Sequence, residues 1–199
     1  MAVITTEMVK QLREKTGAGM MDCKRALEET GGNSDQAVEY LRKKGAATAA
    51  KRADKETNQG VVEAYIHAGG RIGSMVELNC ETDFVAKTPE FKQLAHDIAM
   101  QIAAMSPYYI SREQISKETV EKELEIYKSQ ASNEGKPANI ADKIALGRLD
   151  KFYQEVVLME QSFIKDSGKT IKDLIDEQTA KVGEKISIRR FHRYHLGEN

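Results

Sequence analysis

Residues 61–80, VVEAYIHAGGRIGSMVELNC, decide the class of fold, because they alternate in polarity on both sides of a glycine-rich turn. Such alternation around AGGRIG predicts a β-hairpin. In the first strand the alternating side chains are Val62, Ala64 and Ile66 against Glu63, Tyr65 and His67. In the second strand one face carries Ile72, Ser74, Val76, Leu78 and Cys80.

A helix is predicted after this hairpin and a short polar loop. Thr88 caps the helix, and Pro89 takes the first helical position, which proline tolerates well. The apolar face of the helix is built at helical spacing from Phe91, Leu94, Ala95, Ile98, Ile102 and Met105. The hairpin and the helix together define a core segment over residues 61–111.

Three short helices are predicted within residues 1–45. Thr5 caps the first helix, which a TGAG sequence ends, and the second helix spans about residues 20–29. Asn33 caps the third helix, which we expect to end near Gly45. Helices this short are marginal alone, so we expect them to pack on one another as a module.

A partly helical, alanine-rich linker is expected over residues 46–60. Basic side chains gather in it and just before it: Arg42, Lys43, Lys44, Lys51, Arg52 and Lys55. A solvated helix face is the usual origin of such a run, and a phosphate-binding patch is the alternative.

Residues 112–158 predict two antiparallel helices that form a short coiled-coil arm, with a turn at SNEGKPAN. Apolar residues step by three and four along both helices: Val120, Leu124, Tyr127 and Ala131, then Ala145, Leu149, Phe152 and Val156. Such an arm either packs on its own body or reaches a partner.

Residues 159–199 predict a helix capped by Thr170 and a final strand from Ile186 to about Leu196. This strand completes a three-stranded antiparallel sheet with the hairpin. Because strands and helices do not alternate as in parallel βαβ units, the expected class is α+β.

Composition excludes several classes of protein. Formal net charge is −1, so a generally basic nucleic-acid binder is not indicated. No apolar run approaches the roughly 20 residues of a membrane span. The first ten residues lack the features of a secretory signal, and Cys23 and Cys80 are too few for a disulfide framework. A cytoplasmic protein with two buried thiols is expected.

The motifs of common enzymes are missing from the sequence. It contains no GxxxxGK[ST] phosphate loop, no GxSxG, no HExxH and no Cys/His cluster with zinc spacing. The four histidines are scattered. We therefore expect neither an enzyme nor a bound metal or cofactor.

Phe84 is the unusual residue, because it stands in the short polar loop between the hairpin and the helix at 88–105. It either folds back and fills the gap between them, or it is presented with Asp83 as an anchor for a partner's pocket.

Four stretches resemble the bacterial elongation factor Ts family and together span the chain. They are LREKTGAGMMDCKRAL at 12–27, HAGGRIG at 67–73, NCETDFVAK at 79–87 and IRRFHRYHLGE at 188–198. The resemblance implies a guanine nucleotide exchange factor for elongation factor Tu that binds the GDP form and has no cofactor. The three helices would be a ubiquitin-associated-like module.

The resemblance also implies site residues. Lys10, Arg13, Met20 and Met21 match the family's surface that docks on the GTPase domain of the partner, although from the sequence alone the two methionines could also be core residues. Displacement of the partner's Mg²⁺ is carried over to Thr82, Asp83, Phe84 and Val85. His67 matches a further contact, with the third domain of elongation factor Tu.

One departure from the longer members of the family concerns the core, which occurs here in a single copy. A homodimer would restore both sets of contacts, with the arm or the sheet as its interface. Two rival functions stay open. One is nucleic-acid binding through the linker and Arg189, Arg190 and Arg193, and the other is a scaffold that uses the arm alone.

Overall fold

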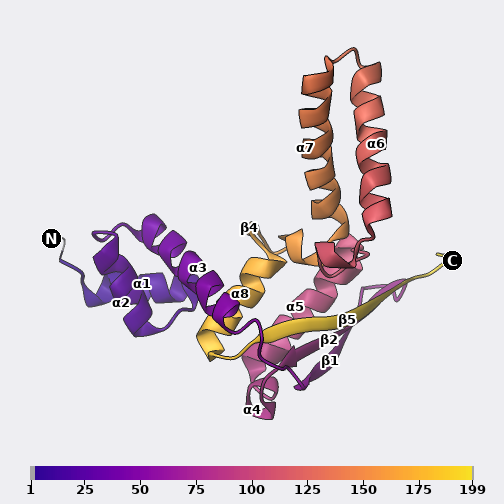
Figure 1. The fold of residues 1–199 in the computed structure, drawn as a ribbon. Coiled ribbons are helices and arrows are strands. Elements are labelled where there is room, and N and C mark those ends of the chain that lie inside the picture. The colour runs from indigo at the N-terminus through magenta and orange to yellow at the C-terminus, as the bar shows by residue number, and fades with distance from the viewer. Residues whose placement is uncertain (1–2, 199) are drawn as a thin grey trace. The chain divides into compact units, whose positions relative to one another are not determined.

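The computed structural model describes residues 3–198 and is a mixture of helix and sheet, so the predicted α+β class is confirmed (Figure 1). The helices are α1 (Thr6–Thr16), α2 (Met20–Glu29), α3 (Ser34–Lys51), α4 (Asp83–Ala86), α5 (Pro89–Met105), α6 (Lys117–Asn133), α7 (Ala138–Val156) and α8 (Ile171–Val182). The strands are β1 (Gln59–Ile66), β2 (Ile72–Cys80), β3 (Ser162–Phe163), β4 (Asp166–Thr170) and β5 (Ile186–His195). Short 3-10 turns lie at Arg112–Gln114 and Leu158–Glu160.

Internal contacts divide the chain into two units, which are described separately. Unit 1 consists of residues 1–63, 76–96 and 172–189, and unit 2 consists of residues 64–75, 97–171 and 190–199. Both are discontinuous in sequence, because the division falls within β1, β2, α5 and β5. Each unit therefore depends on residues far apart along the chain.

In unit 1, helices α1, α2 and α3 share a small apolar core. It is made of Val9, Leu12, Cys23, Ala26, Leu27 and Ala37. The predicted caps are present, since Thr5 Oγ1 accepts from the Met8 amide at 3.2 Å and Asn33 Oδ1 accepts from the Gln36 amide at 3.1 Å. Each cap satisfies a backbone donor that the helix leaves unpaired.

Helix α3 is longer than expected, since it continues past Gly45 to Lys51. The alanines after Gly45 favour helix, and a single glycine within a helix costs only about 1 kcal/mol relative to alanine. A Cβ atom at Gly45 would stand 3.6 Å from the Asp176 carbonyl oxygen and 3.8 Å from the Ala180 Cβ. Gly45 is buried, so α3 continues through it in contact with α8 of the same unit.

The predicted three-stranded sheet of the hairpin and the final strand is present, and its strand order is β1-β2-β5. Val76, Leu78 and Cys80 of β2 are buried. The apolar side of β1 is different, because Val62 and Ile66 are mostly exposed while the alternate side chains are half-buried. Polarity alone therefore does not identify the covered face of this edge strand.

Helix α5 follows the prediction at its start and along most of its apolar face. Thr88 Oγ1 accepts from the Phe91 amide at 3.2 Å. Five residues of the predicted face are buried: Phe91, Leu94, Ala95, Ile98 and Ile102. Met105, the last of the set, is exposed and is the last helical residue, since Ser106 after it has a positive φ of 50°.

In unit 2, α6 and α7 lie side by side and antiparallel, as a helical hairpin (Figure 1). A buried cluster of Ile115, Leu149, Tyr153 and Val157 lies at the base of the hairpin's apolar seam. The predicted positions Val120, Leu124, Tyr127, Phe152 and Val156 pack against this cluster, and Ala131 and Ala145 are buried. The ion pair between Lys128 and Asp142, at 2.9 Å, crosses the hairpin.

Two features of unit 2 escape the sequence prediction. The strands β3 and β4 form a second, two-stranded sheet. Beside it, Gln101 is fully buried, and its Nε2 donates to Gln161 Oε1 at 3.2 Å and to the Ser162 carbonyl at 3.1 Å. This amide pair satisfies polar groups that would otherwise be buried without partners.

Candidate functional site

The segment that holds Phe84 is not an open loop but a single helical turn, α4 (Asp83–Ala86). Thr82 is its N-cap, and Thr82 Oγ1 accepts from the Val85 amide at 3.4 Å. On the far side, Thr88 Oγ1 donates to the Val85 carbonyl at 2.8 Å. The turn is therefore fixed by threonines at both of its ends.

The phenylalanine ring lies in solvent. Phe84 is 80% exposed, whereas Ala86 of the same turn is buried. Because the ring does not fill the gap between the hairpin and α5, the plug interpretation is wrong. A large apolar side chain held outward on a capped turn has the form of an interface anchor.

Asp83 is an anion beside this ring. Lys87 Nζ lies 2.5 Å from Asp83 Oδ2, one helical turn away. The hydrogen bond from Lys87 lowers the pKa of the Asp83 carboxyl below its ordinary value. The turn thus presents an apolar ring and a carboxylate that stays charged at neutral pH.

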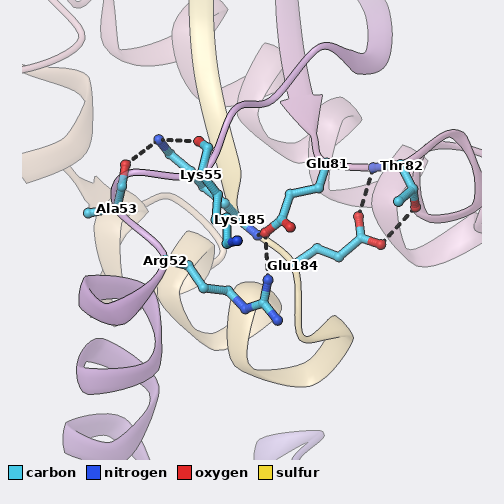
Figure 2. Close-up of polar contacts among 7 residues, drawn as sticks. All are labelled: Arg52, Ala53, Lys55, Glu81, Thr82, Glu184 and Lys185. Atoms are coloured by element: carbon cyan, nitrogen blue, oxygen red, sulfur yellow. Dashed lines mark hydrogen bonds and ion pairs between the residues drawn. The ribbon is translucent and has the colours of Figure 1, made fainter.

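Glu184 holds the base of the turn through two hydrogen bonds to Thr82 (Figure 2). Its Oε1 accepts from Thr82 Oγ1 at 2.7 Å, and its Oε2 accepts from the Thr82 amide at 3.0 Å. Glu184 comes from the connection between α8 and β5, more than a hundred residues along the chain, so no local pattern could have indicated this contact.

Glu81 makes the corresponding contact in the opposite direction. Its Oε1 accepts from the Lys185 amide at 2.6 Å and from Arg52 Nη1 at 2.7 Å (Figure 2). The hydrogen bond from the Lys185 amide, together with Arg52, lowers the pKa of the Glu81 carboxyl. Lys185 Nζ in turn donates to the carbonyls of Ala53 and Lys55.

Cys80 completes the base of the turn. It is fully buried, and its Sγ donates to the Thr82 carbonyl at 3.1 Å. Burial, and to a lesser extent the charge of Glu184, raises the pKa of the Cys80 thiol to about 11. Cys80 and Cys23 are both free and buried, as expected from the sequence.

The four expected docking residues lie on the surface of the three-helix module. Lys10 and Arg13 are exposed on α1. Met20 is 44% exposed and Met21 is 67% exposed at the start of α2. The methionines are therefore not core residues, and unit 1 contains both this surface and the Thr82–Val85 segment.

His67 belongs to unit 2, where the hairpin turns. Its Nδ1 lies 3.1 Å from Tyr65 Oη. It borders a cleft of about 270 Å³, whose other lining residues are Tyr65, Ile72, Met100, Ala103, Ala104, Ile164 and Arg193. An exposed histidine beside a mainly apolar hollow suits a protein contact.

Many of the basic side chains considered for phosphate binding have acidic partners within the chain. Lys43 pairs with Glu39 at 2.8 Å, Lys44 with Asp22 at 2.6 Å, and Arg52 with Glu81. In the C-terminal strand, Arg189 pairs with Glu77 and Arg193 with Glu198. The solvated-face interpretation of the basic run is favoured over a phosphate-binding patch.

The described part of the chain offers no metal centre, since no three His, Cys, Asp or Glu side chains among residues 3–198 gather closely enough to hold an ion. Over the same range, every helix is too short or too polar to cross a membrane.

Comparison with known proteins gives one consistent family. Residues 4–198 match the family model described as elongation factor TS. The elongation factor Ts of Carboxydothermus hydrogenoformans is 62% identical over 98% of this chain and 90% of its own length. That of Moorella thermoacetica is 59% identical over 98% of this chain and 97% of its own length. The similarity thus extends over both units.

Proposed function

Because the chain belongs to the elongation factor Ts family, we propose that it is a guanine nucleotide exchange factor for elongation factor Tu in the elongation stage of translation. The observation that carries the proposal is the exposed Phe84 on its capped turn. An apolar ring of this size, held in solvent beside a carboxylate, has no structural use within its own unit.

The proposed mechanism begins with the GDP-bound partner. Phe84 enters the GTPase domain as a wedge, and Thr82, Asp83 and Val85 accompany it. The groups that hold Mg²⁺ and the phosphates then shift. Since Mg²⁺ neutralises much of the phosphate charge in such sites, its displacement weakens the binding of GDP.

This mechanism needs no covalent step, so the factor is not an enzyme in the ordinary sense and needs no cofactor of its own. The factor lowers the affinity of the partner for nucleotide, and nucleotide lowers the affinity for the factor by the same ratio. The nucleotide-free complex is therefore the most stable one, and GTP releases the factor from it.

Docking is assigned to the three-helix module. Met20 and Met21 offer exposed thioethers that adapt to an uneven surface, and Lys10 and Arg13 add positive charge beside them. His67, at its cleft in unit 2, is assigned a separate contact with the partner's third domain. A cytoplasmic location is part of the same proposal, since translation elongation takes place there.

The factor is also proposed to be a homodimer, with the sheet as its interface. In unit 2 each strand of the sheet exposes a large apolar side chain: Ile66, Met75 and Tyr194. An exposed apolar strand face favours association. Light scattering should give twice the monomer mass of 22.3 kDa, and Ile66→Glu should reduce it. Leu146→Glu, at an exposed position of α7, is the control and should leave the mass unchanged.

The exchange function is tested by the release of a fluorescent GDP analogue from the cognate elongation factor Tu in stopped flow. The wild type should accelerate release strongly, and Phe84→Ala should lose most of this effect. No acceleration by the wild type would refute the function. Equal acceleration by the two proteins would keep the function and reject the wedge.

A further inference from the structure

The turn that carries Phe84 cannot hold its own direction. Helix α4 has four residues, and isolated helices need about 12–15 residues to be even marginally stable. The ring itself makes little contact with the protein, because it is 80% exposed. Whatever fixes the direction of the ring must therefore act at the base of the turn.

The Glu184 carboxylate fixes the base of the turn because it sets the direction of two linked hydrogen bonds, here called the relay: from the Thr82 hydroxyl to Glu184, and from the Val85 amide to the Thr82 hydroxyl. A threonine hydroxyl has one proton and two acceptor lone pairs. Because Thr82 Oγ1 donates its proton to Glu184 at 2.7 Å, its lone pairs remain free for the Val85 amide at 3.4 Å. The second carboxylate oxygen accepts from the Thr82 amide.

The same carboxylate lies within a reciprocal arrangement. Glu184 binds Thr82, just beyond the end of β2, and Glu81 binds the Lys185 amide, just before the start of β5. Strands β2 and β5 are neighbours in the sheet. The side chains of Glu184 and Glu81 therefore add hydrogen bonds between the two chain segments just beyond the paired strands. Arg52 ties the end of α3 to Glu81.

We propose that Glu184 is a positioning residue for nucleotide exchange: it holds Thr82 and thereby aims the turn that presents Phe84. This inference rests on the proposed exchange function. Glu184 itself is half-buried beneath the turn and need not touch the partner. Its contribution lies in keeping the wedge in one orientation before the partner arrives, so that little ordering is needed on binding.

The central variant is Glu184→Gln, which keeps the size of the side chain and removes one acceptor. The NH₂ group of the glutamine can face the Thr82 amide, in which case two donors oppose each other and no hydrogen bond forms. It can instead face the Thr82 hydroxyl, which must then accept a hydrogen bond where it now donates one. We expect the maximal rate of GDP release to fall about tenfold, since hydrogen bonds to charged groups are worth about that factor. The factor concentration at half-maximal rate should stay the same, because the docking module is unaltered.

Further variants separate the hydrogen bonds from charge alone. Glu121→Gln removes the same charge at an exposed position of α6 and should leave the rate unchanged. Thr82→Val removes the hydroxyl that Glu184 holds and should lower the maximal rate as Glu184→Gln does. The combination of Thr82→Val with Glu184→Gln should be no slower than either alone, because both break the same relay.

Amide hydrogen exchange of Val85, measured by NMR on the free factor, tests the inference without the partner. Glu184→Gln should speed this exchange about tenfold, with amides of α5 unchanged. If the maximal rate and the Val85 exchange both equal those of the wild type, Glu184 does not position the turn. If the wild type fails to release GDP, the proposed function fails, and the Val85 result still decides whether Glu184 orders the turn.

Discussion

Phe84 and Phe91 are seven residues apart, and each follows a threonine that caps its helix, yet their surroundings are opposite. Phe84 is 80% exposed on α4, and Phe91 is fully buried on α5. The caps are similar, since Thr82 accepts from the Val85 amide and Thr88 from the Phe91 amide. A threonine cap therefore begins both elements, but the first exposes the ring of Phe84 and the second buries the ring of Phe91.

The difference between them lies in what holds each ring in place. Phe91 belongs to a helix of 17 residues whose apolar face is covered, so packing fixes it. Phe84 belongs to a turn of four residues, whose N-cap Thr82 is held by two hydrogen bonds to Glu184. Burial of Phe91 serves stability, whereas the anchored exposure of Phe84 is proposed to serve binding.

The largest effect is expected from Phe91→Ala. Removing a buried phenylalanine costs about 3–5 kcal/mol, because transfer energy is lost and a cavity remains. Urea unfolding followed by circular dichroism measures the change in the free energy of unfolding. Phe84→Ala is the matched control and should change it by less than about 0.5 kcal/mol. Similar losses of unfolding free energy in the two variants would show that Phe84 also supports the fold.

The next effect concerns Cys80 under the exposed turn. Its thiol has a pKa of about 11, against an ordinary value of 9.0. At pH 8 its reactive thiolate should thus be roughly a hundredfold rarer than that of a free cysteine. Iodoacetamide should therefore label Cys80 in urea but hardly at all in the native protein, as mass spectrometry of its peptide can show. Rapid native labelling would mean that the base of the turn opens readily.

The two caps give a smaller and sharper contrast. Thr88→Ala should lower the free energy of unfolding by about 1 kcal/mol, because α5 loses a satisfied amide at its start. Thr82→Ala should change the global free energy less and the rate of GDP release more. Thermal unfolding and stopped flow on the same two samples provide the measurement. A larger loss of exchange in Thr88→Ala than in Thr82→Ala would contradict this assignment of roles.

The smallest effect is a dependence on acid. The Lys185 amide and Arg52 hold the pKa of Glu81 below its ordinary 4.5. A depressed folded pKa stabilises the protein above the ordinary value, and this stability is lost as pH falls through the folded pKa. Glu81→Gln should therefore unfold at a lower temperature than the wild type at pH 7, and the gap should narrow below about pH 4.5. A gap that is constant from pH 7 to 3 would assign the effect to shape instead of charge.

The sequence predicts those parts of the molecule whose signals are local. Helix α2 spans Met20–Glu29 as expected, and the caps at Thr5, Asn33 and Thr88 are present, because each needs residues only a few positions apart. The expected end of α3 at Gly45 is too early, because a glycine often ends a helix but the alanines that follow this one continue the helix to Lys51.

The parts that could not be predicted depend on residues far apart in sequence. Glu184 meets Thr82 across 102 positions, and Gln101 meets Gln161 across 60. The exposure of Phe84 is of the same kind, because a phenylalanine in a polar loop is compatible with both a plug and an anchor. The family resemblance indicates the Thr82–Val85 segment from the sequence, whereas its contacts with Glu184 are seen only in the folded structure.

Phe84 is proposed to act on the partner, whereas buried Phe91 supports the fold. One crossed measurement tests it directly: GDP release and thermal unfolding, on the same preparations of wild type, Phe84→Ala and Phe91→Leu, with release measured well below every unfolding temperature. We expect Phe84→Ala to keep its unfolding temperature and lose acceleration of release, and Phe91→Leu to unfold at a lower temperature but still accelerate release. Full acceleration by Phe84→Ala would contradict this expectation.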